Sequence, residues 1–156
     1  MNAISATAAA ITDAINEASA SGALSQKVTA VRRWLPVVTI EELNAAGGIF
    51  VLVVPKAFTS TIANRSNDFD DVEIDVGYLT KLSANADEVQ ADTVFDLIEQ
   101  IHGVLRRGFD VPNAAWQERR ADPLFDVAMM EQQRVLRAAT TYRFKVYHNV
   151  VSELLT

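Results

Sequence analysis

The sequence predicts an α+β fold, with a single domain over residues 1–156 in which a mainly antiparallel β-sheet packs against α-helices. Two neighbouring patterns carry this prediction. Hydrophobic and acidic residues alternate over 71–79, which gives a strand one apolar face. The period changes over 92–107, where Leu97 and Ile101 belong to a helical stripe. A half-buried strand followed by an amphipathic helix is typical of a helix packed on a sheet.

Residues 1–22 are predicted to form a helix rich in alanine, the best helix former. Ile4, Ile11 and Ile15 recur at helical spacing, and Gly22 is well placed to end the helix. The apolar stripe is narrow and built largely of small residues. It leaves two interpretations open, which are close packing on the sheet and a contact between subunits.

The next predicted element is a strand over residues 27–35, which are rich in β-branched and aromatic side chains. Pro36 ends this strand or places it at the edge of the sheet. Thr39 then caps a short helical turn, and Glu42 three residues later completes a capping-box pattern.

Residues 49–54 form a continuous apolar run, which predicts a central strand buried on both faces and ended by Pro55. The polar, turn-prone interval 55–71 is predicted to be a hairpin arm whose ends continue the flanking strands. A loop this long is uncommon unless it has a function, so the arm is either a flexible hairpin tip or a contact arm.

The remaining segments differ in how clearly they are patterned. Residues 109–134 show no clear period and carry Trp116 and Phe125, so we expect an excursion packed on the domain surface or onto a neighbour. Residues 135–147 alternate well and predict the last strand. Its outward row is basic and the outward row of 71–79 is acidic, which favours antiparallel pairing of the two strands. The predicted order is therefore α-β-β-β-α-β.

Length and composition narrow the class of protein. At 156 residues the chain is long enough to bury one core, and the absence of cysteine excludes disulfides and thiolate metal sites. The net charge of -6 argues against a general phosphate-binding surface. No apolar run approaches the roughly 18–20 residues needed to span a bilayer. The first charged side chain is Asp13, so a signal peptide is not expected, and we expect a protein made in the cytoplasm with no membrane partner.

No catalytic constellation is evident, so we expect a protein that is not an enzyme and needs no cofactor or metal. His102 lies between core positions of the predicted helix, and His148 has no nearby Ser or Cys nucleophile. Phosphate-loop, dinucleotide-binding and H-E-x-x-H motifs are absent. Asp68, Asp70 and Asp71 have the spacing of a calcium loop but lack its glycine and its final glutamate, which predicts a solvated hairpin.

Several short segments combine in a recognisable way. The strand 72–77 reads VEIDVG and is followed by Lys-Leu at 81–82, an acidic-start helix over 92–107, and a late strand with TYRF at 141–144. The segment 123–137 connects the helix to that last strand. Over roughly residues 27–148, the chain resembles the tail-terminator, or tail-completion, proteins of long-tailed (siphovirus-like) bacteriophages and prophages.

The resemblance implies a structural virion protein at the head–tail junction. Such a protein forms a homomeric ring, typically a hexamer, which caps the tail tube protein and meets the neck or head-closure protein. Genome DNA passes through its lumen without sequence-specific binding. The arm and the excursion supply the expected subunit or partner contacts: Phe58, Ile62, Arg65, Phe69, Trp116, Arg119, Arg120 and Phe125. The alternatives are a head-closure or connector (neck) protein, and a non-viral small α+β binding domain.

Overall fold

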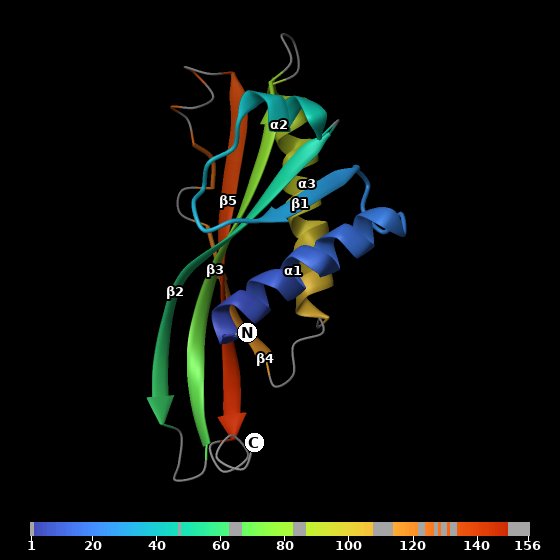
Figure 1. Cartoon of the computed structure of the whole chain (residues 1–156). Helices are drawn as coiled ribbons and strands as arrows, with labels where there is room; N and C mark the ends of the chain where they lie inside the picture. The colour runs from blue at the N-terminus through green and yellow to red at the C-terminus, as the bar shows by residue number, and fades with distance from the viewer. Residues whose placement is uncertain are drawn as a thin grey trace.

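The computed structural model describes residues 2–46, 48–62, 67–82, 87–107, 114–121, 124–126, 128, 131 and 134–149. Its elements along the chain are α1 (Ala3–Ala20), β1 (Val28–Arg32), α2 (Ile40–Ala45), β2 (Ile49–Ile62), β3 (Asn67–Lys81), α3 (Asp87–Arg106), β4 (Ala114–Arg120) and β5 (Val135–Asn149). The strands form one sheet in the order β1-β2-β3-β5-β4 (Figure 1). Among the strand pairs that the structure describes, only β1–β2 is parallel. The predicted α+β class with a mainly antiparallel sheet is confirmed.

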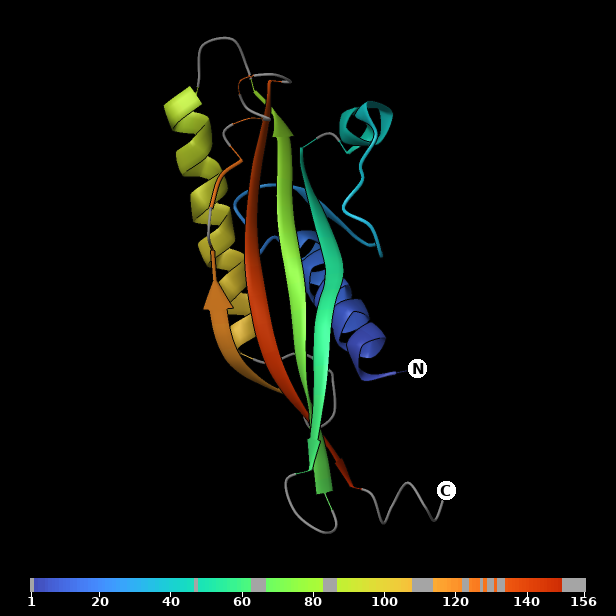
Figure 2. The same ribbon diagram turned by 90° about the vertical axis from the view of Figure 1, so that its left-hand side faces the viewer.

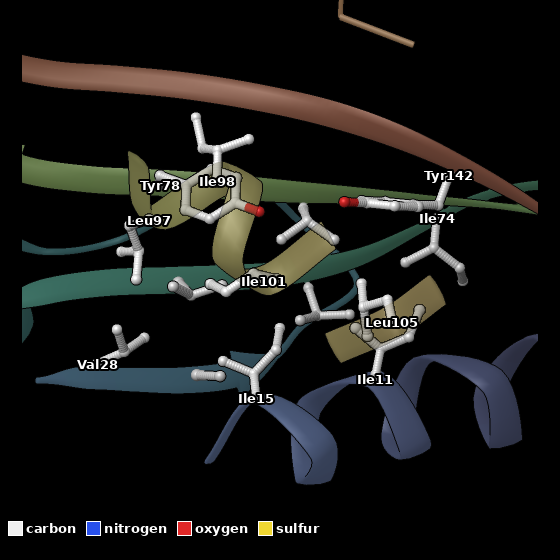
Figure 3. Packing of buried hydrophobic residues seen from close by; sticks show 14 of the residues in the cluster. Ile11, Ile15, Val28, Ile74, Tyr78, Leu97, Ile98, Ile101, Leu105 and Tyr142 are labelled. Atoms are coloured by element: carbon white, nitrogen blue, oxygen red, sulfur yellow. The ribbon is translucent and has the colours of Figure 1, made fainter. Parts of the chain in front are cut away.

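Two helices cover one face of the sheet and bury the main core. The alternating residues of β3 on this face, which include Ile74 and Tyr78, are fully buried. Leu97 and Ile101 of α3 and Ile11 of α1 meet them from the helix layer (Figure 3). Complete burial of an aliphatic side chain of this size contributes about 1.5–3 kcal/mol. The apolar stripe of α3 and the apolar face of β3, which the sequence patterns predict, therefore pack against each other.

The predicted central strand is buried on both faces. Val51 and Val53 belong to the core under α1 and α3. Phe50 and Leu52 point the other way, into a smaller cluster with Leu43 of α2. A strand covered on both sides has no polar face, which explains the continuous apolar run in the sequence.

The prediction that Pro55 ends this strand is wrong, because β2 continues to Ile62. β1 pairs with β2 only as far as Val53, so Pro55 lies where the outer edge of β2 has no described strand beside it. The register with β3 also shifts between Pro55 and Ala57. Proline is tolerated at an edge or a bulge, where the ladder does not need its missing N–H.

Pairing of β3 with β5 confirms the predicted antiparallel contact between an acidic and a basic row. Glu73 lies opposite Arg143 in the register of the two strands. The carboxylate of Asp75 accepts a hydrogen bond from Thr141 Oγ1 at 2.6 Å. On the other side of β5, Arg143 makes an ion pair of 3.2 Å with Glu118 of β4. Such cross-strand pairs each contribute a few tenths of a kcal/mol.

The strand β4 lies inside the segment 109–134, for which the sequence predicts no element of its own. Its alternation is broken by a register shift between Trp116 and Glu118. It is an edge strand that packs chiefly Trp116 against the core and carries charged residues beyond it. The predicted order α-β-β-β-α-β therefore lacks one strand, and it also omits α2 as an element of the fold.

The Ala-rich helix packs on the sheet, as the first of its two interpretations expects, and it also closes the edge of β1. The Asn16 side-chain amide donates to the Ala30 carbonyl at 3.0 Å and accepts from the Ala30 N–H at 2.9 Å. Ser19 Oγ accepts a hydrogen bond from the Val28 N–H at 3.1 Å. Side chains of α1 thus take the place of a neighbouring strand along β1, which is one way that proteins protect a sheet edge.

Gly22 ends α1 as predicted, because its φ of 78° is a left-handed conformation that glycine adopts without strain. The Gly22 N–H donates to the Ser19 carbonyl at 3.3 Å, and the Ala23 N–H donates to the Ala18 carbonyl at 3.0 Å. This pair of hydrogen bonds defines a Schellman motif at the end of the helix. The predicted cap of α2 is also present, since Thr39 accepts from the Glu42 N–H.

None of the helices in the described ranges has the length and apolar character needed to cross a membrane.

Candidate interaction surface

The acidic residues of the arm are held by strand pairing. Asp70 accepts a hydrogen bond from Ser60 Oγ at 2.5 Å, directly across the β2–β3 pair. Asp71 lies opposite Lys145 in the β3–β5 register. The side chain of Asp68 is outside the described residues. In the part of the chain that the structure describes, no three metal-ligating side chains lie together.

His102 packs between two aromatic rings. Its centroid lies 5.4 Å from that of Trp116, edge to face, and 5.9 Å from that of Tyr142. Nδ1 is buried with no hydrogen-bond partner among the described residues. Burial, and then the nearby Arg119 guanidinium, lower the pKa of His102, and Glu99 opposes this shift. The imidazole is therefore a neutral packing group, which is the structural role that the sequence favours.

This environment predicts a pH dependence of stability. The pKa of His102 is lower in the folded chain than its ordinary value near 6.5, so the unfolded chain binds more protons between these two values. The contribution of His102 is fully present above about pH 6.5 and is lost as the pH falls towards the folded pKa. In thermal unfolding, we expect the wild type to lose more stability than His102→Gln between about pH 7.5 and pH 5. Both proteins carry the same carboxylates, so the pH dependence that these groups cause is equal in the two profiles. Parallel pH profiles for the two proteins would therefore contradict the lowered pKa of His102.

The predicted contact residues of the arm lie on a three-stranded ribbon of β2, β3 and β5. Phe58 is opposite Val72, on the same side as the helices, and its side chain is 62% exposed. Phe69 points to the other face, where its ring contacts Tyr147 at 5.8 Å and Lys145 lies over it at 4.5 Å. The Ile62 side chain and the whole of Arg65 are outside the described residues. The arm thus presents aromatic rings on both faces.

The other predicted contact residues lie in the body of the molecule. Trp116 and Phe125 are partly buried and pack against the core, and Phe125 also forms a β-bridge with Ala138. Arg119 makes an ion pair of 2.7 Å with Glu99 of α3. Arg120, at the end of β4, is exposed. Trp116, Phe125 and Arg119 are therefore engaged in contacts within the chain. Of these four residues, Arg120 is the one that faces solvent.

A second exposed apolar surface was not predicted. Of the eight large hydrophobic side chains that are exposed among the described residues, four lie in residues 34–40, which we call the 34–40 strip. Their exposed fractions are 63% for Trp34, 69% for Leu35, 62% for Val37 and 66% for Ile40. Large apolar side chains that are exposed close together make a surface a candidate for contact with a partner.

The 34–40 strip is exposed because β1 ends at Arg32, whereas the sequence predicts a strand up to residue 35. The Arg33 guanidinium donates to the Val37 carbonyl at 2.8 Å and makes an ion pair of 2.6 Å with Glu42. Arg33 thus holds the segment as a loop, and the apolar side chains that would have alternated on a strand face solvent. Four large apolar residues around Pro36, with no polar residue between Trp34 and Thr39, are the signal that could have revealed this surface.

An open groove of about 590 Å³ joins the 34–40 strip to the arm. Trp34 and Phe58 both line it, together with the start of α1, residues 55–57 and Asp70. The outer edge of β2 borders this groove beyond Val53, where no described strand pairs with it. A strand edge that no described strand pairs with, beside a mainly apolar groove, is an arrangement to which an extended peptide can add a strand.

No family model matches the sequence, and no curated protein matches it significantly.

Proposed function

We propose that this chain is a tail terminator of a long-tailed bacteriophage or prophage, a structural protein that closes as a homomeric ring on the finished tail tube. The observation that carries the proposal is the juxtaposition of the resembling segments. Residues 72–77 lie in β3 and residues 141–144 lie beside them in β5, with Ile74 opposite Tyr142. The resembling helix, α3, packs on the core face of the same two strands. The motifs thus belong to one structural unit.

The shape of the chain supports this role. The ends of β2, β3 and β5 extend beyond the helices as a projecting arm (Figure 1). A ring of identical subunits needs heterologous contacts, in which one patch of a subunit meets a different patch of the next. The exposed Phe58 on the arm and the groove beside it offer a projecting part and a receiving part.

In this role the protein acts through contacts alone. One side of the ring rests on the tail tube protein and the other meets the neck or head-closure protein, so the ring forms part of the head–tail junction. Genome DNA passes through the lumen. The net charge of -6 disfavours retention of DNA, because acidic groups repel the phosphate backbone.

Deletion of the gene in a phage that carries it tests the proposal. We expect tail tubes of uncontrolled length and no attached heads, because nothing ends the tube or offers a surface to the neck. Complementation with the wild-type gene restores normal tails, and antibody labelling of purified virions places the protein at the head–tail junction.

Two other outcomes are informative. Tails of normal length beside heads that leak DNA would favour the head-closure alternative, since the tube would then end correctly without this protein. Particles of normal form and infectivity would exclude both virion functions and favour a non-viral binding domain.

A further inference from the structure

The outer edge of β2 along the arm has no described strand beside it. β1 pairs with β2 only as far as Val53, and the Arg33 N–H donates to the Val53 carbonyl at 2.9 Å at the end of that pairing. Residues 57–62 pair with β3 on their inner side, so alternate residues direct their backbone N–H and C=O groups outward. Figure 2 shows β2 as the outermost strand where the arm leaves the body.

Two other edges of the same sheet are protected. Side chains of α1 bond the outer edge of β1 through Asn16 and Ser19. β4 ends in three charged residues, Glu118, Arg119 and Arg120, and charge on an edge strand disfavours further pairing. The absence of such protection on residues 57–62 therefore distinguishes this edge from the other two.

On β2 the protection stops where the arm begins. Pro55 and Lys56 are residue types that keep other strands from an edge, and the register shift between Pro55 and Ala57 adds an irregularity. Residues 57–62 read AFTSTI and contain no charged residue, proline or glycine. A six-residue uncharged edge rich in β-branched and aromatic residues is a template for another strand.

The sequence of this edge is complementary to itself. If two copies of 57–62 lie antiparallel with Ser60 opposite Ser60, then Phe58 lies opposite Ile62 and Thr59 lies opposite Thr61. An aromatic residue opposite a β-branched residue, and threonine opposite threonine, are favourable cross-strand pairs. No like charges meet in this register, because the six residues carry none.

We propose that the 57–62 edge of β2 binds the same edge of a second copy of this chain, antiparallel and about a two-fold axis at Ser60. The two arms join as one continuous ribbon with the strand order β5-β3-β2-β2-β3-β5. The contact is isologous, since each copy offers the same surface, and it closes after two copies.

The groove beside the edge becomes part of the contact. In this register the chain that follows Ile62 in one copy continues past Ala57 and Lys56 of the other copy. These two residues line the groove together with Trp34 and Phe58. The second copy therefore covers two large apolar side chains that are exposed in the single chain.

This contact goes beyond the proposed function and does not rest on it. A ring uses heterologous contacts, whereas a pair of arms is two-fold, so the dimer is a form of the free protein outside the ring. The paired segment is only six residues long, and two-stranded pairing of that length is marginal in water. We therefore expect a dimer that dissociates on dilution.

Sedimentation velocity up to millimolar protein tests the association. We expect a monomer–dimer equilibrium for the wild type and a monomer for Ser60→Lys, because the register places the two lysines opposite each other. Gln26→Lys, at an exposed position outside the arm, is the matched control for an added charge and should dimerise like the wild type. Thermal unfolding shows whether each variant is folded.

A single introduced cysteine tests the register independently, since the sequence contains none. Antiparallel pairing places the Cα atoms of the two residues 60 about 4.5–5.5 Å apart, within the range of a disulfide. Ser60→Cys should therefore cross-link to a dimer under mild oxidation. Ala57→Cys, exposed on the same edge, is the matched control. Residue 57 lies opposite residue 63 in this register, so its two cysteines are about 20 Å apart and should not cross-link.

Three results would each overturn the contact. A wild type that stays monomeric at millimolar concentration would leave the edge to a segment of a different protein. A folded Ser60→Lys variant that associates like the wild type would place the contact on another surface. A Ser60→Cys variant that cross-links no faster than Ala57→Cys would exclude the two-fold register at residue 60.

Discussion

Replacing Leu97 with alanine lowers the free energy of unfolding by about 2–5 kcal/mol, the range for large-to-small changes in a packed core. Leu97 has no exposed surface and lies in the layer between α3 and the sheet (Figure 3). Removal of its branched end leaves a cavity that neighbouring side chains fill only in part. Denaturant unfolding at constant pH measures the loss, read as a shift of the midpoint without a change of slope.

Phe95 provides the matched control for this prediction. It lies two residues earlier in the same helix and is 44% exposed, so Phe95→Ala should change the free energy of unfolding far less than Leu97→Ala. Equal losses for the two variants would show that the buried face of α3 is assigned incorrectly.

Gly48→Ala is expected to cost about 1–3 kcal/mol, through overpacking against the backbone. A Cβ atom at this position would lie 2.6 Å from the Lys27 carbonyl oxygen, closer than any stable contact. The same oxygen accepts from the Ile49 N–H at 3.4 Å, at the start of the parallel β1–β2 pair. The chain must therefore shift where the two strands begin to pair. Thermal unfolding of the variant measures the cost.

Gly103→Ala separates this clash from a general effect of losing glycine. Within the described ranges, a Cβ atom there would meet only the Arg107 side chain, at 3.9 Å. Alanine inside a helix is favoured over glycine by about 0.5–1 kcal/mol, so this variant should be more stable than the wild type. A stable Gly48→Ala protein beside a destabilised Gly103→Ala protein would contradict the packing at both positions.

Segments in which one periodicity dominates could be predicted from the sequence. β3 and α3 each have one buried face and one solvated face, so burial repeats every second residue in the first and at helical spacing in the second. Charge added a longer-range prediction, since the acidic row of β3 and the basic row of β5 indicated which strands are neighbours. The register of Glu73 opposite Arg143 confirms that reasoning.

Elements whose form depends on distant contacts could not be predicted in the same way. β4 has little periodicity because its register shifts at Trp116, and its position is fixed by pairing with β5. Pro55 ended the predicted strand because sequence alone cannot show that β1 pairs with β2 only as far as Val53 and leaves the outer edge of β2 open beyond it. The parallel pairing of β1 with β2 is likewise a property of the topology.

The residues of the candidate interaction surface also differ in whether the sequence alone could predict them. Phe58 and Phe69 on the arm were identified because aromatic residues interrupt a polar segment, and both lie on the surface of the ribbon. The 34–40 strip was missed because its residues have strong strand preference, and only the contacts of Arg33 show that they form a loop. Local preference predicts the conformation of a segment poorly when one side chain redirects the backbone.

The hydrogen bonds from α1 to β1 have a consequence for how the protein avoids aggregation. Asn16 presents to Ala30 the donor and acceptor that another strand would present, so the helix competes directly with any intruding chain for that edge. When α1 detaches, the N–H of Val28 and both polar groups of Ala30 become available to a second molecule. The α1 helix thus shields the β1 edge, and its detachment would expose that edge to pairing with strands of other molecules.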